Sequence, residues 1–427
     1  MGKGCPMSRV RIDAIKPGNT LAEDVINADG RFLLGKGTML DPAHLRVLKI
    51  WGITSVEIQG TPGEDLAVSS EAIDPAILQA AARYVRENFC LADLTHPFMK
   101  EVFEVCTRRR ARRMLAEPTE GGTAGSREPE TPPVFSPQAA SVGENRKRKL
   151  DALLKKDVCL PSLPEIFGEL TEVLGDPRSS AFHVANVISK DPNLSARLLK
   201  IVNSAFYGFP SKIDTISRAV MIVGSKQLST LALGTSVIHI FRDIPPDLVD
   251  MKSFWQHSVA CGIGARMLAS YKNLANTERL FVAGLLHDIG RILIYKHFPQ
   301  DGRETLLKAR QARCLLRSAE IELLGFDHAQ IGGDLLKKWM LPPTLERAVA
   351  DHHQPADSQY AVEAAAVYLA DILVNALGIG TSGESYVPPL FPEVWQEIGL
   401  PLEAISKIVP FIDRQIEEIM HNFFDER

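Results

Sequence analysis

The sequence has no cysteine pairs at metal-binding or redox spacing. Its six cysteines are scattered, and none forms a C-x-x-C pair: Cys5, Cys90, Cys106, Cys159, Cys261 and Cys314. Zinc ribbons and thioredoxin-like redox sites are recognised by such pairs. The pattern therefore predicts reduced thiols in a cytoplasmic protein rather than a disulfide framework.

Long apolar runs and a strong excess of charge are also missing. No stretch approaches the ~18 consecutive apolar residues of a membrane span, and the start of the chain lacks the apolar core of a signal peptide. The formal net charge is −4, which gives no electrostatic reason to expect a nucleic-acid partner. We therefore expect a cytoplasmic protein that binds neither membranes nor nucleic acids.

Composition and periodicity divide the chain into five segments. Residues 8–60 alternate apolar and polar residues between turn signals, which predicts a small α+β module, and residues 72–116 have helical spacing. Residues 117–145 contain five prolines and four glycines, which predicts a flexible, disordered linker. Residues 146–360 are helical almost throughout, and further helices follow in residues 361–427. The fold class is mainly all-α, a helical bundle with a small α+β module ahead of it.

The most informative pair is His287-Asp288, which interrupts an apolar helix pattern running from Leu280 to Ile289. A helix that is apolar nearly all round is buried. A buried carboxylate is costly unless it is paired or bound to a metal. The pair therefore indicates a metal site or the remnant of one.

Other histidines and one acid stand in similar surroundings. His257 shares a predicted helix face with Phe254 and Cys261, and Asp371 lies in another apolar helix. His328 begins a helix, and His352-His353 follow an apolar helix end. Inward-pointing histidines and carboxylates from different helices are how metal sites are built in bundles. These ligand types suit Fe, Mn, Zn or Mg, and the sequence does not choose among the four metals.

Each of these residues taken alone has a simpler explanation. His257 could be a satisfied core histidine, His328 a helix start, and the double histidine a solvated loop. Asp371 could bond a neighbouring backbone group or an arginine. His297, beyond the end of the apolar helix, is assigned to the surface. One cation would explain all the buried polar groups together, which is why we favour it.

Several motifs in order resemble the HDOD family, the HD-related output domains of bacterial signalling proteins, over about residues 150–360. They are Leu160-Pro-Ser-Leu-Pro164, Ile188-Ser-Lys-Asp-Pro192, Val202-Asn-Ser-Ala-Phe-Tyr-Gly208, Phe254-Trp-Gln-His257, Gly284-Leu-Leu-His-Asp-Ile-Gly290, Gly325-Phe-Asp-His328, Trp339-Met-Leu-Pro342 and His352-His353. The amino-terminal Ile15-Lys-Pro-Gly18 and Leu34-Gly-Lys-Gly37 are similar to a small domain placed ahead of HD-GYP cyclic-di-GMP phosphodiesterases.

The resemblance implies a ligand set and two opposed functions. HD phosphohydrolases hold a metal through residues that correspond here to His257, His287, Asp288 and Asp371, and the metal activates water against a phosphoester. The HD-GYP branch adds histidines for a second metal, and His328, His352 and His353 stand at matching places. HDOD proteins, by contrast, are regarded as non-catalytic regulatory or interaction modules.

Two departures from the active phosphodiesterase pattern count against cyclic-di-GMP hydrolysis. Arg291 stands where those enzymes carry lysine, and the segment after the double histidine, Gln354-Pro-Ala-Asp-Ser358, has no Gly-Tyr-Pro signature. Arg291 could neutralise a substrate phosphate, or it could be a surface cation that ends the helix. If the site is active, Asp288 and Arg291 are the expected catalytic residues.

We therefore expect a bacterial signal-transduction protein whose helical domain is an output or protein-interaction module with a bound divalent metal. Its expected partners are signalling proteins. The aromatic Phe206 and Tyr207 form either an interaction patch or core packing. The alternative is a metal-dependent phosphohydrolase or phosphodiesterase that acts on a nucleotide second messenger. No particular partner, cofactor-binding residue or oligomeric state follows from the sequence.

Overall fold

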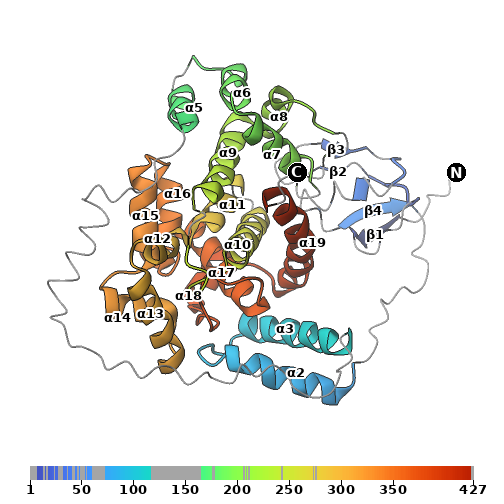
Figure 1. The fold of residues 1–427 in the computed structure, drawn as a ribbon. Coiled ribbons are helices and arrows are strands. Elements are labelled where there is room, and N and C mark those ends of the chain that lie inside the picture. Colours follow the sequence, from blue (N-terminus) through green and yellow to red (C-terminus); the bar gives the residue numbers. More distant parts are fainter. Residues whose placement is uncertain are drawn as a thin grey trace.

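The computed structural model describes residues 7–59 with gaps, 73–116, and 165–424 with short gaps (Figure 1). The predicted linker, residues 117–145, lies outside the described residues. The mainly α-helical fold expected from the sequence is confirmed.

The amino-terminal module contains two small antiparallel sheets. Strand β1 (Met7–Arg11) pairs with β4 (Ser55–Gln59), and β2 (Val25–Ile26) pairs with β3 (Phe32–Leu34). Alternate residues of a strand point to opposite faces, so Val56 and Ile58 of β4 lie on one side. They pack with Leu21, Leu40 and Leu48 in a core of the module's own.

Helices form the rest of the described chain. They are α2 (Pro75–Asn88), α3 (Pro97–Ala116), α5 (Glu165–Gly175), α6 (Ala181–Ser189), α7 (Pro192–Val202), α8 (Ile216–Val223), α9 (Ser225–Ile240), α10 (Met251–Tyr271), α11 (Thr277–Leu286), α12 (Ile289–His297), α13 (Pro299–Ala312), α14 (Leu316–Leu324), α15 (His328–Lys338), α16 (Pro343–Ala350), α17 (Ala361–Leu377), α18 (Pro392–Ile398) and α19 (Ile405–Phe424). Two short 3₁₀ turns, η2 (Pro355–Asp357) and η3 (Leu402–Ala404), precede α17 and α19. Among the described residues no helix has the length and apolarity to cross a membrane.

Side-chain caps fix where the helices of the site begin. Asp250 accepts a hydrogen bond from the Ser253 amide at the start of α10. Asp327 accepts one from the Gln330 amide at 2.9 Å at the start of α15. Such caps satisfy amides that have no partner within the helix. The cap at Asp327 therefore places His328 at the first position of α15.

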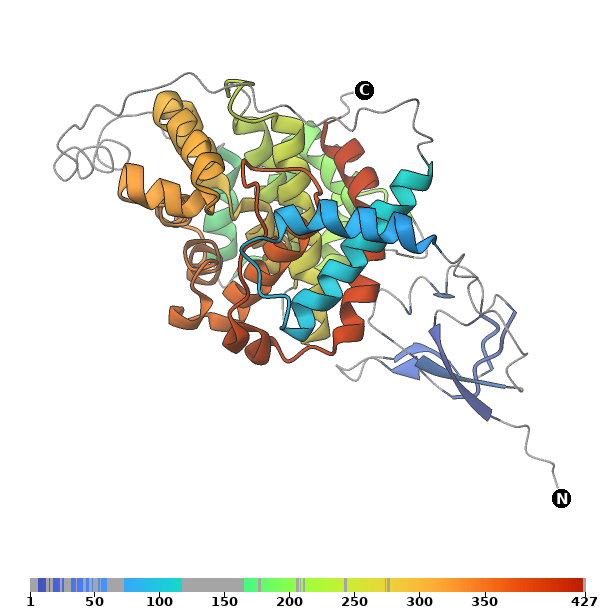
Figure 2. The same ribbon diagram turned by 90° about the horizontal axis from the view of Figure 1, so that it is seen from below.

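Helix α10 is the centre of the bundle and packs against α11, α17 and α19 (Figures 1 and 2). Helices α2 and α3 lie against each other, and α3 also contacts α17 and α19 (Figure 2). Arg109 of α3 pairs with Asp413 of α19. The packing brings α10, α11, α12, α15, α16 and α17 together around one point, where the polar residues of the core gather.

Two glycines let the backbones around that point approach closely. A Cβ on Gly284 would lie 2.7 Å from the carbonyl carbon and oxygen of Cys261, and one on Gly290 would lie 2.0 Å from the carbonyl oxygen of His328. Real side chains do not tolerate such distances. Gly284 therefore sets α11 against α10, and Gly290 sets α12 against α15.

We expect Gly290→Ala to lower the free energy of unfolding by about 1–3 kcal/mol, the usual cost of overpacking a core. The added methyl group must push α12 from α15. Gly168→Ala in α5 is the matched control, because nothing lies within 4 Å of its Cβ position. There the loss of backbone freedom in the unfolded chain should stabilise by about 0.4–1 kcal/mol. Thermal unfolding of both variants checks this, and equal effects would contradict the assigned role of Gly290.

Candidate metal centre

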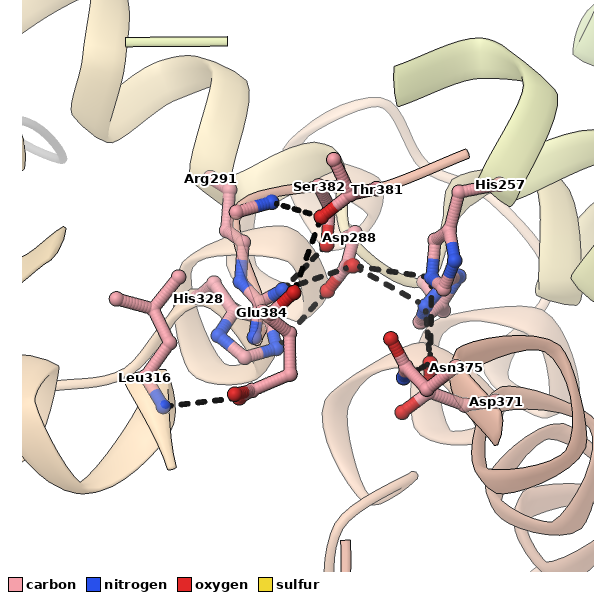
Figure 3. Close-up of polar contacts among 12 residues, drawn as sticks. His257, Asp288, Arg291, Leu316, His328, Asp371, Asn375, Thr381, Ser382 and Glu384 are labelled. Carbon is pink, nitrogen blue, oxygen red and sulfur yellow. Dashed lines mark hydrogen bonds and ion pairs between the residues drawn. The ribbon is translucent and has the colours of Figure 1, made fainter. Parts of the chain in front are cut away.

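Seven predicted ligands from five parts of the bundle converge at this point. They are His257 on α10, His287 and Asp288 between α11 and α12, His328 at the start of α15, His352 and His353 after α16, and Asp371 on α17. Figure 3 labels His257, Asp288, His328 and Asp371. All but His353 are at most 5% exposed, and His353 is partly exposed. The structure thus brings together every residue that the sequence nominated as a metal ligand.

The first group of ligand atoms surrounds one oxygen of Asp371. His257 Nε2 lies 3.2 Å and His287 Nε2 lies 3.5 Å from Asp371 Oδ1. His287 Nε2 is also 3.3 Å from Asp288 Oδ2. Asn375, one turn further along α17, donates to Asp371 Oδ1 at 2.7 Å and fixes the carboxylate (Figure 3).

The second group lies on the other side of Asp288. His328 Nε2 is 3.0 Å from Asp288 Oδ1 and 2.8 Å from His353 Nε2. Ligand atoms of His328, His352 and His353 all lie within 4.8 Å of one another. Asp288 therefore faces both groups, one with each carboxylate oxygen.

In three of the histidines the ring nitrogen that points away from the other ligands, Nδ1, has a hydrogen-bond partner, which leaves Nε2 to bind a metal. His287 Nδ1 is 2.7 Å from the Gly284 carbonyl oxygen, and His352 Nδ1 is 2.7 Å from that of Val349. A carbonyl only accepts, so both Nδ1 atoms carry hydrogen and each neutral ring offers the Nε2 lone pair to the site. His328 Nδ1 is similarly 2.6 Å from Glu320 Oε2. Such outer partners are the usual support of metal-bound histidines.

Nε2 of His287 and Nε2 of His352 are among the buried nitrogens of the site that make no hydrogen bond. A buried polar atom without a partner costs free energy, so an unmade bond calls for an explanation. A cation placed among these nitrogens and the carboxylates would satisfy both. The donor set of imidazole and carboxylate therefore fits a divalent metal.

Arg291 is buried, so the surface cation, one of the two alternatives that the sequence left open, is excluded. It is 3% exposed, because α12 is covered by α13 and α15. Its Nη1 lies 3.2 Å from Asp288 Oδ2, and its Nε lies 3.3 Å from Glu320 Oε1. It also donates to the Ser382 hydroxyl (Figure 3). The guanidinium is thus directed at a predicted metal ligand.

The carboxylates dominate the electrostatics of the site. Burial opposes protonation of His287, but Asp288 and Asp371 outweigh it and raise the pKa of His287 to about 10. Burial and Arg291 oppose protonation of His328, yet Glu320 and Asp288 raise its pKa to about 9. Burial, with the cationic His287 and His328 nearby, lowers the pKa of His352 to about 3. In the absence of metal, protons on His287 and His328 therefore supply positive charge that a bound metal would otherwise supply.

Burial raises the pKa of a carboxyl group, and here the neighbouring cations overcome it. Arg291, His287 and His328 hold the pKa of Asp288 well below its usual range. His257 and His287, whose Nε2 atoms lie 3.2 Å and 3.5 Å from Asp371 Oδ1, do the same for Asp371. Both carboxylates are therefore ionised and available as ligands at neutral pH.

Sequence reasoning missed three contributors to the site. Glu320 on α14 bonds both the backbone amide and the ring of His328, and Ser382, between α17 and α18, bonds Arg291. Cys261 was noted only as a member of the His257 face, although it lies one turn from that ligand. A buried glutamate on an otherwise amphipathic helix was the available signal for Glu320. Nothing local pointed to Ser382.

Two other sequence expectations have plain outcomes. His297, which the sequence assigned to the surface, is only partly exposed, and it lies outside the cluster. Tyr207 is buried and stacks on Phe209, so core packing describes it. Phe206 lies outside the described residues.

A comparison with protein-family models matches the description "HDOD domain" to residues 160–355. Residues 160–355 form an HDOD domain. The matched residues include six of the seven ligand candidates, whereas Asp371 and helices α17–α19 lie beyond them. The amino-terminal module is outside the match.

Solved structures share the fold of this HDOD domain. A Geobacter sulfurreducens HDOD protein of unknown function is 24% identical, covers 65% of this chain and 96% of its own, and has a TM-score of 0.53. A candidate phosphohydrolase from Shewanella amazonensis is 27% identical, with 64% and 98% coverage and a TM-score of 0.52. An uncharacterised protein from Treponema pallidum is 27% identical over 199 residues, 45% of this chain and 37% of that relative. The chain thus spans little more than a third of that curated relative.

Proposed function

We propose that the HDOD domain is a metal-binding regulatory module of a bacterial cytoplasmic signal-transduction protein, and that its output is contact with other signalling proteins rather than hydrolysis. The observation that carries this proposal is the buried pair of Arg291 and Asp288. In this pair Arg291 binds Asp288, the carboxylate that faces both groups of ligand atoms. The metal identity among Fe, Mn, Zn and Mg is left open by the donor types.

Catalytic metal sites keep an open position for water and substrate, whereas structural sites are closed. Here Asp288 is engaged through both oxygens, by His328 on one side and by Arg291 on the other. Six ligand candidates are at most 5% exposed. A phosphoester would have to displace Arg291 and enter a buried site, which favours regulation over turnover.

Neither the amino-terminal module nor the segment Asn203–Gly208 of the sequence identifies a partner protein. Similarity of Ile15-Lys-Pro-Gly18 and Leu34-Gly-Lys-Gly37 to the domain ahead of HD-GYP phosphodiesterases supports a signalling context. The module has a hydrophobic core of its own. We propose that it senses or docks, while the helical domain transmits the result.

A second candidate function is metal-dependent phosphohydrolysis of a nucleotide. The complete set of histidines and aspartates favours it, as does the likeness to the Shewanella amazonensis structure named as a candidate phosphohydrolase. A bound metal would polarise the phosphoryl oxygen and lower the pKa of water. Arg291 would leave Asp288 and bind the substrate phosphate through two hydrogen bonds.

Metal analysis and an activity assay of the full chain, purified without chelator, separate the two functions. We expect bound metal and no turnover of cyclic dinucleotides or generic phosphodiesters. Turnover that is lost in Asp288→Asn but kept in His297→Ala would overturn the regulatory proposal in favour of hydrolysis. His297 is the matched control because it is a histidine of the same helical region outside the cluster. Protein that stays metal-free in metal-supplemented buffer would contradict both functions.

A further inference from the structure

Cys261 lies inside the first group of ligand atoms. It follows His257 by one turn of α10, so the two side chains share a face. Its Sγ is 3.6 Å from His257 Nε2, and the residue is fully buried. It is one of the free cysteines of the described chain. A metal ion bound to His257 Nε2 would therefore also lie close to the Cys261 thiol.

Three of the six distances between the four ligand atoms are those of a tetrahedral zinc site. One atom each of His257, Cys261, His287 and Asp371 lie within 4.8 Å of one another. Zinc bonds of about 2.3 Å to sulfur and about 2.0–2.2 Å to nitrogen or oxygen require ligand atoms roughly 3.3–3.6 Å apart. The distances are 3.6 Å for Cys261 to His257, 3.2 Å for His257 to Asp371 and 3.5 Å for His287 to Asp371.

Charge balance also favours the thiol over Asp288 at this position. Buried charges need partners, and Asp288 already has a buried one in Arg291. A dication at the first group would then be balanced by Asp371 and a Cys261 thiolate. The unpartnered Nε2 of His287 gains a bond in the same arrangement.

We infer that Cys261 is a thiolate ligand of a four-coordinate Cys-His₂-Asp site that selects zinc over magnesium or manganese. This inference rests on the proposed metal-binding function. On binding, the Sγ–H bond breaks and its proton goes to solvent, while the electron pair left on sulfur forms the bond to the metal, so no oxidant or reductant is needed. Thiolate ligands favour zinc and softer metal ions, whereas magnesium and manganese prefer oxygen ligands.

The competing explanation is that Cys261 is a small apolar side chain that fills the contact of α10 with α11. Free cysteine is among the most buried residue types and often serves as packing. That explanation predicts that Cys261→Ala leaves metal binding unchanged. Cys106→Ala is the matched control, because Cys106 is also buried and free but lies on α3 and donates to Ala376.

The test is cobalt substitution of the full chain followed by absorption spectroscopy. Cobalt bound to a thiolate has an intense sulfur-to-metal charge-transfer band in the near ultraviolet, in addition to weaker visible d–d bands. We expect that band in the wild type and in Cys106→Ala, and its loss in Cys261→Ala with the d–d bands retained. Zinc affinity of Cys261→Ala should fall by more than the roughly 10–100-fold that loss of a supporting outer residue costs.

The outcomes separate this inference from the proposed function. Visible d–d bands without the charge-transfer band in the wild type would overturn the role of Cys261 and leave metal binding intact. Unchanged zinc affinity in Cys261→Ala would do the same. Failure of the wild type to bind either cobalt or zinc would overturn the metal-binding function itself, and the inference with it. The wild-type spectrum decides even if a variant does not fold.

Discussion

Asp288→Ala is expected to lower the free energy of unfolding of the metal-free protein by about 3–5 kcal/mol, the usual cost of removing one partner of a buried ion pair. The substitution leaves Arg291 in the core with Glu320 as its remaining carboxylate contact within ion-pair distance. It also removes the carboxylate that faces His287 and His328. Urea or thermal unfolding in the presence of chelator measures the change.

The matched control is Asp247→Ala. Asp247 also pairs with an arginine, Arg303, at 2.5 Å, but that pair is solvent-exposed. Exposed pairs contribute little because water solvates both charges, so no measurable change is expected. Equal stability of the two variants would show that the Arg291–Asp288 pair is not the buried pair described here, and would remove the main support for a closed site.

The second large expected effect is metal-dependent stabilisation that grows with pH. Free metal at about 1,000 times its dissociation constant should stabilise the folded protein by about 4 kcal/mol. The pKa of His287 is raised from 6.5 to about 10 and that of His328 to about 9. Their protonated forms therefore stabilise the metal-free protein fully below about pH 6.5, and this contribution is lost as pH rises through those values.

Metal must displace these protons, because only the neutral ring binds. The rise in melting temperature on adding zinc should therefore be small below pH 6.5 and larger near pH 9. His287→Ala should abolish most of the rise, and His297→Ala, outside the cluster, should keep it. A rise of equal size at both pH values, or one that persists in His287→Ala, would be inconsistent with metal at this site.

The ligand candidates were predictable because a buried polar residue leaves a strong mark in a sequence. His287, Asp288 and Asp371 interrupt helices that are apolar on every side, and a single burial argument nominates all three. Their convergence was not in the local pattern and came from the ordered motifs of the HDOD resemblance. The helical fold class followed from periodicity alone.

What sequence reasoning missed or left open depends on tertiary contacts. The sequence left open whether Arg291 is a surface cation, and the packing of α12 against α13 and α15 buries it. Ser382 belongs to a connecting segment far along the chain, and its bond to Arg291 has no local signature. Cys261 lies one helical turn after His257 on the same face of α10. A cysteine on a buried helix face usually serves as a small packing residue, so the sequence did not single it out.

The ligand candidates come from helices that are far apart in sequence and are buried between them. A metal ion held there could leave only when these helices separate, so its exchange would be limited by local opening of the bundle. The rate of metal exchange would then be a direct measure of how often α10 and α17 part. A partner protein that loosened or tightened this contact would change the lifetime of the bound ion.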